Sequence, residues 1–190
     1  MDRPSSGARR FGLRRHFAVA PWSDYVEVHW ADGAEAYVTP VGPDLVGVAV
    51  LFTGRGDYDH WLGRFPAIRS NVDGAAYASD VRGAGPLRQR AATPAAGRVL
   101  FVGDAAGYVD ALTGEGISVG LRSAAALVDC VRTDRPSDYA RAWRRATRRY
   151  RLFTEPLVRA AAVPALHRAI VPAAALMPAV FRTAVNMVSR

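Results

Sequence analysis

The chain has 190 residues, a length that fits one domain or one domain with an appendage. Half of the residues are hydrophobic and 22% are charged, which indicates a folded protein and excludes a disordered tail. All 25 basic residues are arginines, and they stand against 17 acidic residues, which gives a net charge of +8. Because lysine is absent while alanine is abundant, we attribute part of this basicity to coding bias. The single cysteine, Cys130, excludes an internal disulfide framework and any multi-cysteine zinc or iron–sulfur site.

We expect neither a signal peptide nor a membrane-spanning helix. Two arginine pairs, at 9–10 and 14–15, are not followed by the apolar run of roughly 7–15 residues that a signal peptide needs. Residues 169–181 are uncharged, but they are fewer than the ~20 that span a bilayer, and they include two prolines. The sequence therefore predicts a buried or interfacial helix there and a cytoplasmic protein.

Apolar and alternating runs predict a β-sheet region over residues 13–92, after a flexible basic leader at 1–12. Three strands are expected, at Tyr25 to Trp30, Glu35 to Val41 and Leu45 to Phe52. Asp32-Gly33 is a strong hairpin signal between the first two, and a Gly-Pro-Asp turn precedes the third. These features are typical of an antiparallel meander. A helix over Tyr58 to Phe65 and a further strand within Ala75 to Arg82 follow.

Helices dominate after Gly97. Residues 98–102 form a short apolar strand, and Gly116 to Val131 is a helix that is apolar nearly all round, which predicts burial. Ser137 is expected to cap a second helix that reaches about Phe153, before proline-punctuated helices end the chain. On a helical wheel, one face of this second helix carries Arg141, Arg144, Arg145, Arg148 and Arg149. The opposite face carries Trp143, Ala146, Tyr150, Phe153 and Leu157.

The stretch 97–123 carries the chemistry. Its strand delivers Asp104 to the carboxyl end, where α/β sheets bind ligands. Small neighbours, Gly103 and Ala105 among them, let the backbone approach a ligand closely. Some ten residues later, Gly114-Glu115-Gly116 presents backbone N–H groups at a helix start, which suits an anion or an electron-rich carbonyl. The carboxylate and the helix terminus form a two-point clamp for a hydroxylated, electron-accepting ligand.

These residues resemble the flavin-side motif of FAD-dependent oxidoreductases related to aromatic-ring hydroxylases, especially the geranylgeranyl-reductase-like branch. The resemblance implies that Gly103, Asp104 and Ala105 contact FAD, with the Asp104 carboxylate on a ribityl hydroxyl. It also implies that a second group opens the helix whose N-terminus faces the pyrimidine edge of the isoalloxazine: Gly114, Glu115, Gly116 and Ile117. We expect the side chain of Glu115 to be structural and the neighbouring backbone to make the contact.

The resemblance is strong at 97–123 and loose elsewhere. The aspartate–proline pair of the family's intervening loop is half kept, since Asp110 is followed by Ala111. Gly107 stands where hydroxylase relatives carry a histidine, which favours the reductase-like branch. The earlier strands resemble the family's substrate-binding sheet, with Gly85-Pro86-Leu87-Arg88 leading back to the FAD domain.

The sequence contains no G-x-G-x-x-G fingerprint of a dinucleotide-binding βαβ unit. Gly83-Ala84-Gly85 runs into a proline, and the glycine that follows Gly116 comes one position late, at Gly120. We therefore expect an α+β chain that is a fragment of an α/β FAD-binding fold and lacks a site for the ADP half of FAD. It would comprise an antiparallel substrate-binding sheet (13–92), a strand–loop–long-helix FAD segment (93–135) and C-terminal helices (136–190).

Other patterns have simpler explanations. Gly116 to Gly120 matches the G-x-S-x-G elbow of hydrolases, but Ser118 falls inside a helix instead of on a strand-to-helix turn. The arginine face is interpreted as a solvated helix surface, since the aromatic residues lie opposite and do not interleave with it. An acidic partner or a membrane surface is the alternative. The four histidines lack metal-binding spacing, and Cys130 is expected to be an inert core thiol.

We predict a flavin-dependent oxidoreductase, either a reductase or a monooxygenase, that acts on a small apolar, unsaturated or aromatic substrate. FAD is the expected cofactor and NAD(P)H the electron donor. We expect no metal, no nucleic acid and no stable protein partner, and we assign no catalytic acid or base. Peripheral membrane contact through the C-terminal helices stays open. The alternative is a non-enzymatic remnant or interaction module that uses the arginine-rich helix and the apolar tail.

Overall fold

The computed structural model describes residues 9–89, 91–161 and 163, together with 172, 175–177 and 179. The chain forms two compact units, which meet in sequence between Leu87 and Arg88. Most of the stretch 169–181, where a helix was expected, and most of the expected leader lie outside the described residues. No helix within the described part of the chain is long and apolar enough to span a bilayer.

The N-terminal unit is built on an antiparallel sheet with the strand order β2-β3-β4-β1-β5, in which β6 also pairs with β1. The strands are β1 (Arg10–Ala18), β2 (Glu27–Ala31), β3 (Ala34–Gly42), β4 (Leu45–Thr53), β5 (Ala76–Tyr77) and β6 (Arg82–Ala84). The predicted meander is confirmed as β2-β3-β4. Its first turn needs the glycine, because Gly33 has a φ of +75°.

Strand β1 occupies a central place in the sheet, where the sequence predicted a leader up to residue 12. It pairs with β4 over most of its length, with Phe17 opposite Val46, and with β5 and β6 on its other side. The strand was hard to recognise because Arg15 interrupts the apolar face formed by Phe11, Leu13 and Phe17. The Arg15 guanidinium stacks over the ring of Tyr77, 3.9 Å from its centroid.

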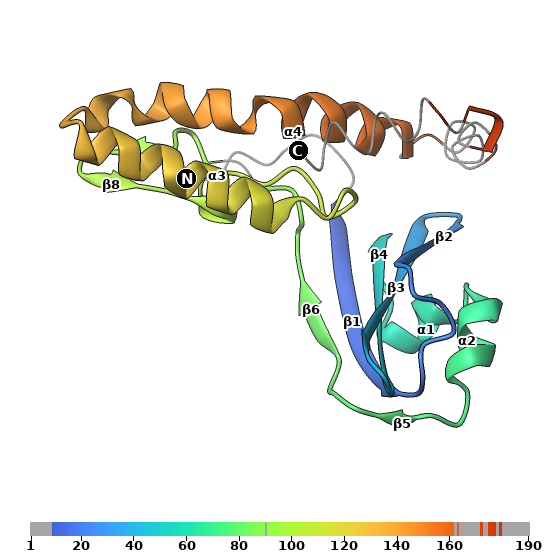
Figure 1. Ribbon diagram of the computed structural model, residues 1–190. Helices are drawn as coiled ribbons and strands as arrows, with labels where there is room; N and C mark the ends of the chain where they lie inside the picture. Colours follow the sequence, from blue (N-terminus) through green and yellow to red (C-terminus); the bar gives the residue numbers. More distant parts are fainter. Residues whose placement is uncertain are drawn as a thin grey trace. The chain divides into compact units, whose positions relative to one another are not determined.

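Two short helices, α1 (Tyr58–Leu62) and α2 (Pro66–Val72), cover one face of this sheet (Figure 1). Only α1 was predicted. The Asp57 side chain caps it by accepting a hydrogen bond from the His60 N–H at 2.8 Å. Large apolar side chains of both helices pack on β1, β3 and β4 to form the core of the unit. The further strand expected within Ala75 to Arg82 is present only as the two-residue β5, and β6 begins at the last residue of that range.

The C-terminal unit is dominated by two long helices that lie side by side, α3 (Gly116–Arg132) and α4 (Tyr139–Ala161) (Figure 1). A two-stranded ribbon of β7 (Ala95–Ala96) and β8 (Val99–Leu100) and a 3-10 turn, η1 (Gly103–Ala105), precede them. A second 3-10 turn, η2 (Pro136–Asp138), stands where Ser137 was expected to cap a helix. Helix α4 continues through Pro156, which lies on its exposed side, where the carbonyl released by the missing N–H can meet water.

Helix α3 is not buried all round, contrary to the prediction. One side packs against α4 through Val119, Ser123 and Cys130. The other side leaves four large apolar side chains exposed by 48 to 81%: Ile117, Leu121, Val128 and Val131. The strand before the helix is likewise not buried, since Val99 is 55% exposed. The apolar pattern was recognised correctly, but within the described residues only one side of α3 has a covering layer.

Three buried tyrosines predict a loss of stability at alkaline pH. Burial raises the pKa of Tyr58, Tyr139 and Tyr150 above the ordinary value near 10. The folded state therefore holds these protons more tightly, so the tyrosines' contribution to the free energy of unfolding should be constant below about pH 10 and decrease as the pH rises further. Denaturant titrations at neutral and alkaline pH measure this.

Tyr58→Phe supplies the control. Removing the hydroxyl loses its 3.1 Å hydrogen bond to the Val48 carbonyl, so the variant should be less stable at neutral pH. The variant also lacks a tyrosine whose pKa is raised by folding. The difference in free energy of unfolding between the variant and the unaltered protein should therefore become smaller above about pH 10. A deficit that is the same at both pH values would contradict the assignment.

Candidate functional site

The first part of the candidate site is the turn η1, which carries Gly103, Asp104 and Ala105 at the end of the β8 segment. The side chain of Asp104 is exposed. Gly103 has a φ of +55°, and its N–H donates to the Ser123 hydroxyl at 3.2 Å. Ser123 is fully buried in α3 and donates in turn to the Gly120 carbonyl at 2.8 Å. The buried hydroxyl therefore fixes the turn that presents Asp104.

A second contact between the turn and α3 depends on two glycines. A Cβ atom built on Gly103 would lie 3.8 Å from the Cα of Gly120, and a Cβ on Gly120 would lie the same distance from the Cα of Gly103. The two backbones therefore approach each other without intervening side chains. This close approach places the turn of Asp104 directly on the helix that begins at Gly116.

The second part of the candidate site is the start of α3. Gly114 has a φ of +68°, and no heavy atom lies within 4 Å of where its Cβ would be. Glu115 is the N-cap residue, so the backbone N–H groups of the first turn, from Gly116 onward, have no acceptor within the helix. Ile117 follows with 81% of its surface exposed. Backbone donors and open space thus occur together, which is what an electron-rich ligand edge requires.

Glu115 is engaged within the protein. Its carboxylate is 2.9 Å from the guanidinium of Arg122, about two turns further along α3, and the residue is only 9% exposed. The pair ties the cap to the helix body. The expected structural role of the Glu115 side chain therefore agrees with its contacts, and the backbone beside it is left for a ligand.

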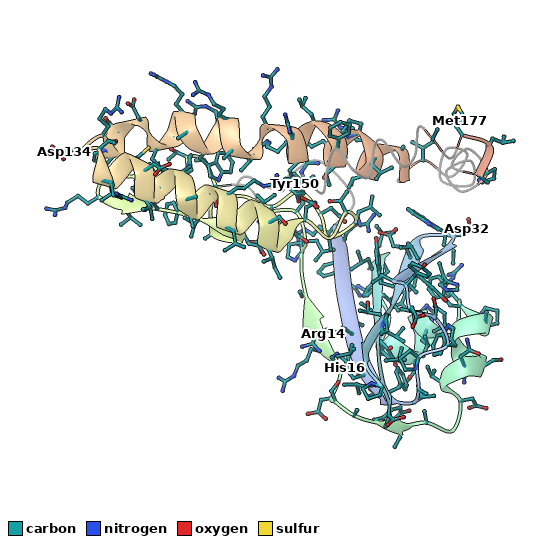
Figure 2. All side chains as sticks on the ribbon, viewed as in Figure 1. Arg14, His16, Asp32, Asp134, Tyr150 and Met177 are labelled. Atoms are coloured by element: carbon teal, nitrogen blue, oxygen red, sulfur yellow. The ribbon has the colours of Figure 1, made fainter. Side chains whose placement is uncertain are left out.

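The loop between the two parts is held by Tyr150 of α4, which reaches it from the neighbouring helix (Figure 2). Its hydroxyl accepts hydrogen bonds from the N–H groups of Val109 and Asp110, both at 3.3 Å, and donates to the Asp110 carbonyl at 3.1 Å. Asp110 is itself buried and accepts from the Leu112 N–H at 3.1 Å. Burial raises the pKa of Tyr150, so the hydroxyl keeps the proton that it donates.

Two further hydroxyl contacts connect α4 to the same region. Thr154 lies 3.3 Å from the Thr113 hydroxyl, just before Gly114. Tyr139 donates to the Phe101 carbonyl at 2.6 Å, just before Gly103. Sequence reasoning missed these residues because it assigned α4 no role in the site, and it also gave no role to Ser123 of α3. A signal was available, since Tyr150 is a polar-tipped residue on the apolar face of a strongly amphipathic helix.

The competing sites find little support. Ser118 lies in the first turn of α3, some distance from any strand, so the geometry of a hydrolase nucleophile is not formed. The described residues contain no group of three or more His, Cys, Asp or Glu side chains that could hold a metal ion. Cys130 is a free, buried thiol on the side of α3 that faces α4.

The arrangement offers two chemically different contacts. The exposed carboxylate of Asp104 can accept hydrogen bonds from ligand hydroxyls. The start of α3 offers N–H donors and the positive end of a helix dipole, which stabilise negative charge on a ligand oxygen. Both are held by hydroxyl groups of the helix pair, Ser123 of α3 and Tyr139 and Tyr150 of α4, and both are open to an incoming ligand.

Removal of the Tyr150 hydroxyl should loosen this loop. Tyr150→Phe leaves the Asp110 carbonyl and two buried N–H groups without their partner, so the free energy of unfolding should fall by about 1–3 kcal/mol. Hydrogen exchange of the Val109 and Asp110 amides should become faster. Tyr25→Phe, at a residue that is 80% exposed, is the matched control and should change stability by less than about 0.5 kcal/mol. Unchanged amide exchange in Tyr150→Phe would contradict the anchoring role.

The two facing glycines should respond oppositely to alanine. Gly120→Ala places a methyl group at an ordinary contact distance within a helix and should raise the free energy of unfolding by about 0.5–1 kcal/mol. Gly103→Ala forces a side chain onto a left-handed backbone and should lower it by about 1–2 kcal/mol. Chemical denaturation of both variants measures these changes in the free energy of unfolding. If both variants change by the same amount in the same direction, the positive φ of Gly103 is not the reason for a glycine at that position.

Comparison with known proteins gives matches by structure only. No protein-family model matches the sequence, and no curated protein matches it. The flavin-dependent brominase Bmp2 superposes with a TM-score of 0.74 at 14% identity, over 94% of this chain and 50% of that one. The Diels-Alderase PyrE3 of pyrroindomycin biosynthesis superposes with a TM-score of 0.70 at 19% identity, over 97% and 45% of the two chains.

The flavin-dependent halogenase CmlS gives a TM-score of 0.61 at 19% identity, over 78% of this chain and 32% of that one. This chain therefore spans half or less of the length of the three enzymes. At these identities the likeness concerns the fold. The fold of the chain resembles that of one part of these flavin-dependent enzymes.

Proposed function

We propose that this chain is the flavin-proximal and substrate-sheet part of an FAD-dependent oxidoreductase. The observation that carries the proposal is the joining of Asp104 and the open start of α3 through the close approach of Gly103 to Gly120. Structural neighbours that are flavin-dependent enzymes support it. A variant of one neighbour, the halogenase PltM, was solved in complex with FAD and superposes with a TM-score of 0.58.

The residues present fit the flavin half of FAD. Asp104 would bind a ribityl hydroxyl, and the backbone N–H groups at the start of α3 would bind the carbonyl edge of the ring. The left-handed Gly114 and the open space beside it supply the room that a planar ring needs. When bound, the flavin supplies hydride transfer or oxygen activation. The helix terminus would stabilise negative charge at the edge of the ring that it faces.

We infer that the ADP half of FAD binds to a part of the fold outside this sequence. Three observations support this. The sequence has no G-x-G-x-x-G fingerprint, and the chain spans 50% of Bmp2 and 32% of CmlS. The third is the exposed apolar side of α3 with Ile117, Leu121, Val128 and Val131, which has the character of a face that a further layer covers.

The reaction that we propose is a reduction or a monooxygenation of a small apolar, unsaturated or aromatic substrate in the cytoplasm, with NAD(P)H as the electron donor. Gly107 supports the reductase over the hydroxylase, because a glycine there offers no side chain to the site. The sheet of the N-terminal unit would bind the substrate. One of its faces packs on α1 and α2, and the other includes Arg14 and His16 on β1, which Figure 2 shows away from these helices.

Flavin binding by the isolated chain tests the proposal. Fluorescence titrations with FAD and with riboflavin should give dissociation constants that agree within about threefold, because the ADP group finds no site here. Asp104→Ala should weaken the binding of both by about 10- to 100-fold, as expected for a lost charge-assisted hydrogen bond. Asp129→Ala removes another exposed acid, from α3, and should leave binding unchanged.

Two results would overturn the proposal in distinguishable ways. If FAD binds at least 100-fold more tightly than riboflavin, the ADP half has a site in this chain. The inference that the ADP half binds outside this sequence is then wrong. If a folded chain binds neither flavin, or if Asp104→Ala binds both as well as the unaltered protein, the assignment of the flavin contacts is wrong.

A further inference from the structure

Helix α4 presents an extended arginine surface. It contains seven arginines and one acidic residue, Glu155. Its outer face, here called the arginine face, consists of Arg141, Arg144, Arg145, Arg148 and Arg149, all of which are exposed. Trp143 and Tyr150 lie on the opposite side and are buried. In Figure 2, nitrogen-tipped side chains project from α4 on the side away from α3.

Most of this charge is not neutralised within the described part of the chain. Asp138 lies 3.9 Å from Arg141, and Glu155 is shared by Arg88, Arg151 and Arg159 at 3.3 to 4.0 Å. Among the described residues, no ion pair is formed by the other four members of the arginine face. They include two like-charged pairs at i, i+4, Arg144 with Arg148 and Arg145 with Arg149, which destabilise a helix. The free protein therefore bears a repulsion that an anionic surface would relieve.

The residues around the arginine face favour lipid over nucleic acid. The nearby aromatic rings, Trp143 and Tyr150, are buried and unavailable for stacking on bases. The face continues instead into an exposed aliphatic residue, Leu152, which is 60% exposed and lies on the wheel between Arg145 and Arg148. Further along the chain, Leu176 and Met177 are 82% and 53% exposed within the uncharged stretch 169–181. Arginines combined with exposed aliphatic residues are typical of a helix that lies at a membrane surface.

We propose that the arginine face of α4 docks on a membrane surface that contains anionic lipids. The guanidinium groups bind lipid phosphates, which they match in geometry, and Leu152 meets the boundary of the acyl chains. The inference does not depend on the proposed flavin site. The arginine face lies on the side of α4 opposite to Tyr150, and it is Tyr150 that holds the loop at Val109 and Asp110. No part of the proposal requires the helix to enter the bilayer.

Vesicle co-sedimentation of the full chain tests the proposal. Binding is expected to mixed phosphatidylglycerol and phosphatidylcholine vesicles, not to phosphatidylcholine alone, and should weaken strongly as salt is raised. Each arginine near an anionic surface contributes roughly fivefold to binding. Replacing Arg144, Arg145, Arg148 and Arg149 together by glutamine should therefore weaken it by roughly 100-fold or more.

A control variant with the same net charge shows whether the loss of vesicle binding is due to the arginine face or to net charge alone. Replacing Arg55, Arg69, Arg82 and Arg98 by glutamine removes the same charge from exposed positions outside α4 and should retain most of the binding. The α4 variant should melt at the same temperature as the unaltered protein or higher, because glutamine is a good helix former and the repulsion is gone. Its riboflavin affinity should be unchanged, which separates this test from that of the proposed function.

Three results would overturn the inference. The two quadruple variants could lose binding equally, which would leave net charge as the cause. The chain could fail to sediment with anionic vesicles at low salt. It could also bind duplex DNA or RNA more tightly than the vesicles through the same four arginines, which would make the partner a nucleic acid.

Discussion

The packing of α4 against α3 is the interaction on which the candidate site depends. Neither of the two ligand-facing parts is stabilised by extensive strand pairing, since β8 has only two residues and η1 only three. They are held in position instead by hydrogen bonds with side-chain hydroxyl groups of the two helices: Ser123 of α3, and Tyr139, Tyr150 and Thr154 of α4. Ser123, Tyr139 and Tyr150 each satisfy a backbone group of the loops, where an unpaired buried N–H or C=O would be costly, and Thr154 contacts the Thr113 hydroxyl.

Helix α3 has two sides suited to packing: one contacts η1 and α4, and the other is apolar and exposed. Gly120, Ser123 and Val119 face η1 or α4, while four other large apolar residues of α3 are exposed: Ile117, Leu121, Val128 and Val131. A helix that only completed a two-helix hairpin would carry polar residues on that second side. The sequence of α3 is thus that of a central element, and its start, where the cofactor contacts are proposed, lies at the end of this exposed apolar side.

Much of the fold could be predicted from sequence, because its signals are local. Alternation and the Asp32-Gly33 turn specified the meander, and the glycines at 114 and 116 specified where α3 begins. What could not be predicted depends on contacts far apart in the chain. Arg15 concealed β1, because only the fold shows that Tyr77 covers its guanidinium. Apolar periodicity indicated that α3 has partners on both sides, but not which side is covered in this chain. The hydroxyl of Tyr150 meets Asp110, 40 residues away.

The arginine face is built from guanidinium groups alone, and the chain contains no lysine. The charge of the face therefore cannot be removed by acetylation, which acts on lysine. An attachment made through it would be a constitutive one. It would respond to ionic strength and to the lipid composition of the surface, and enzymes that modify lysine could not switch it off.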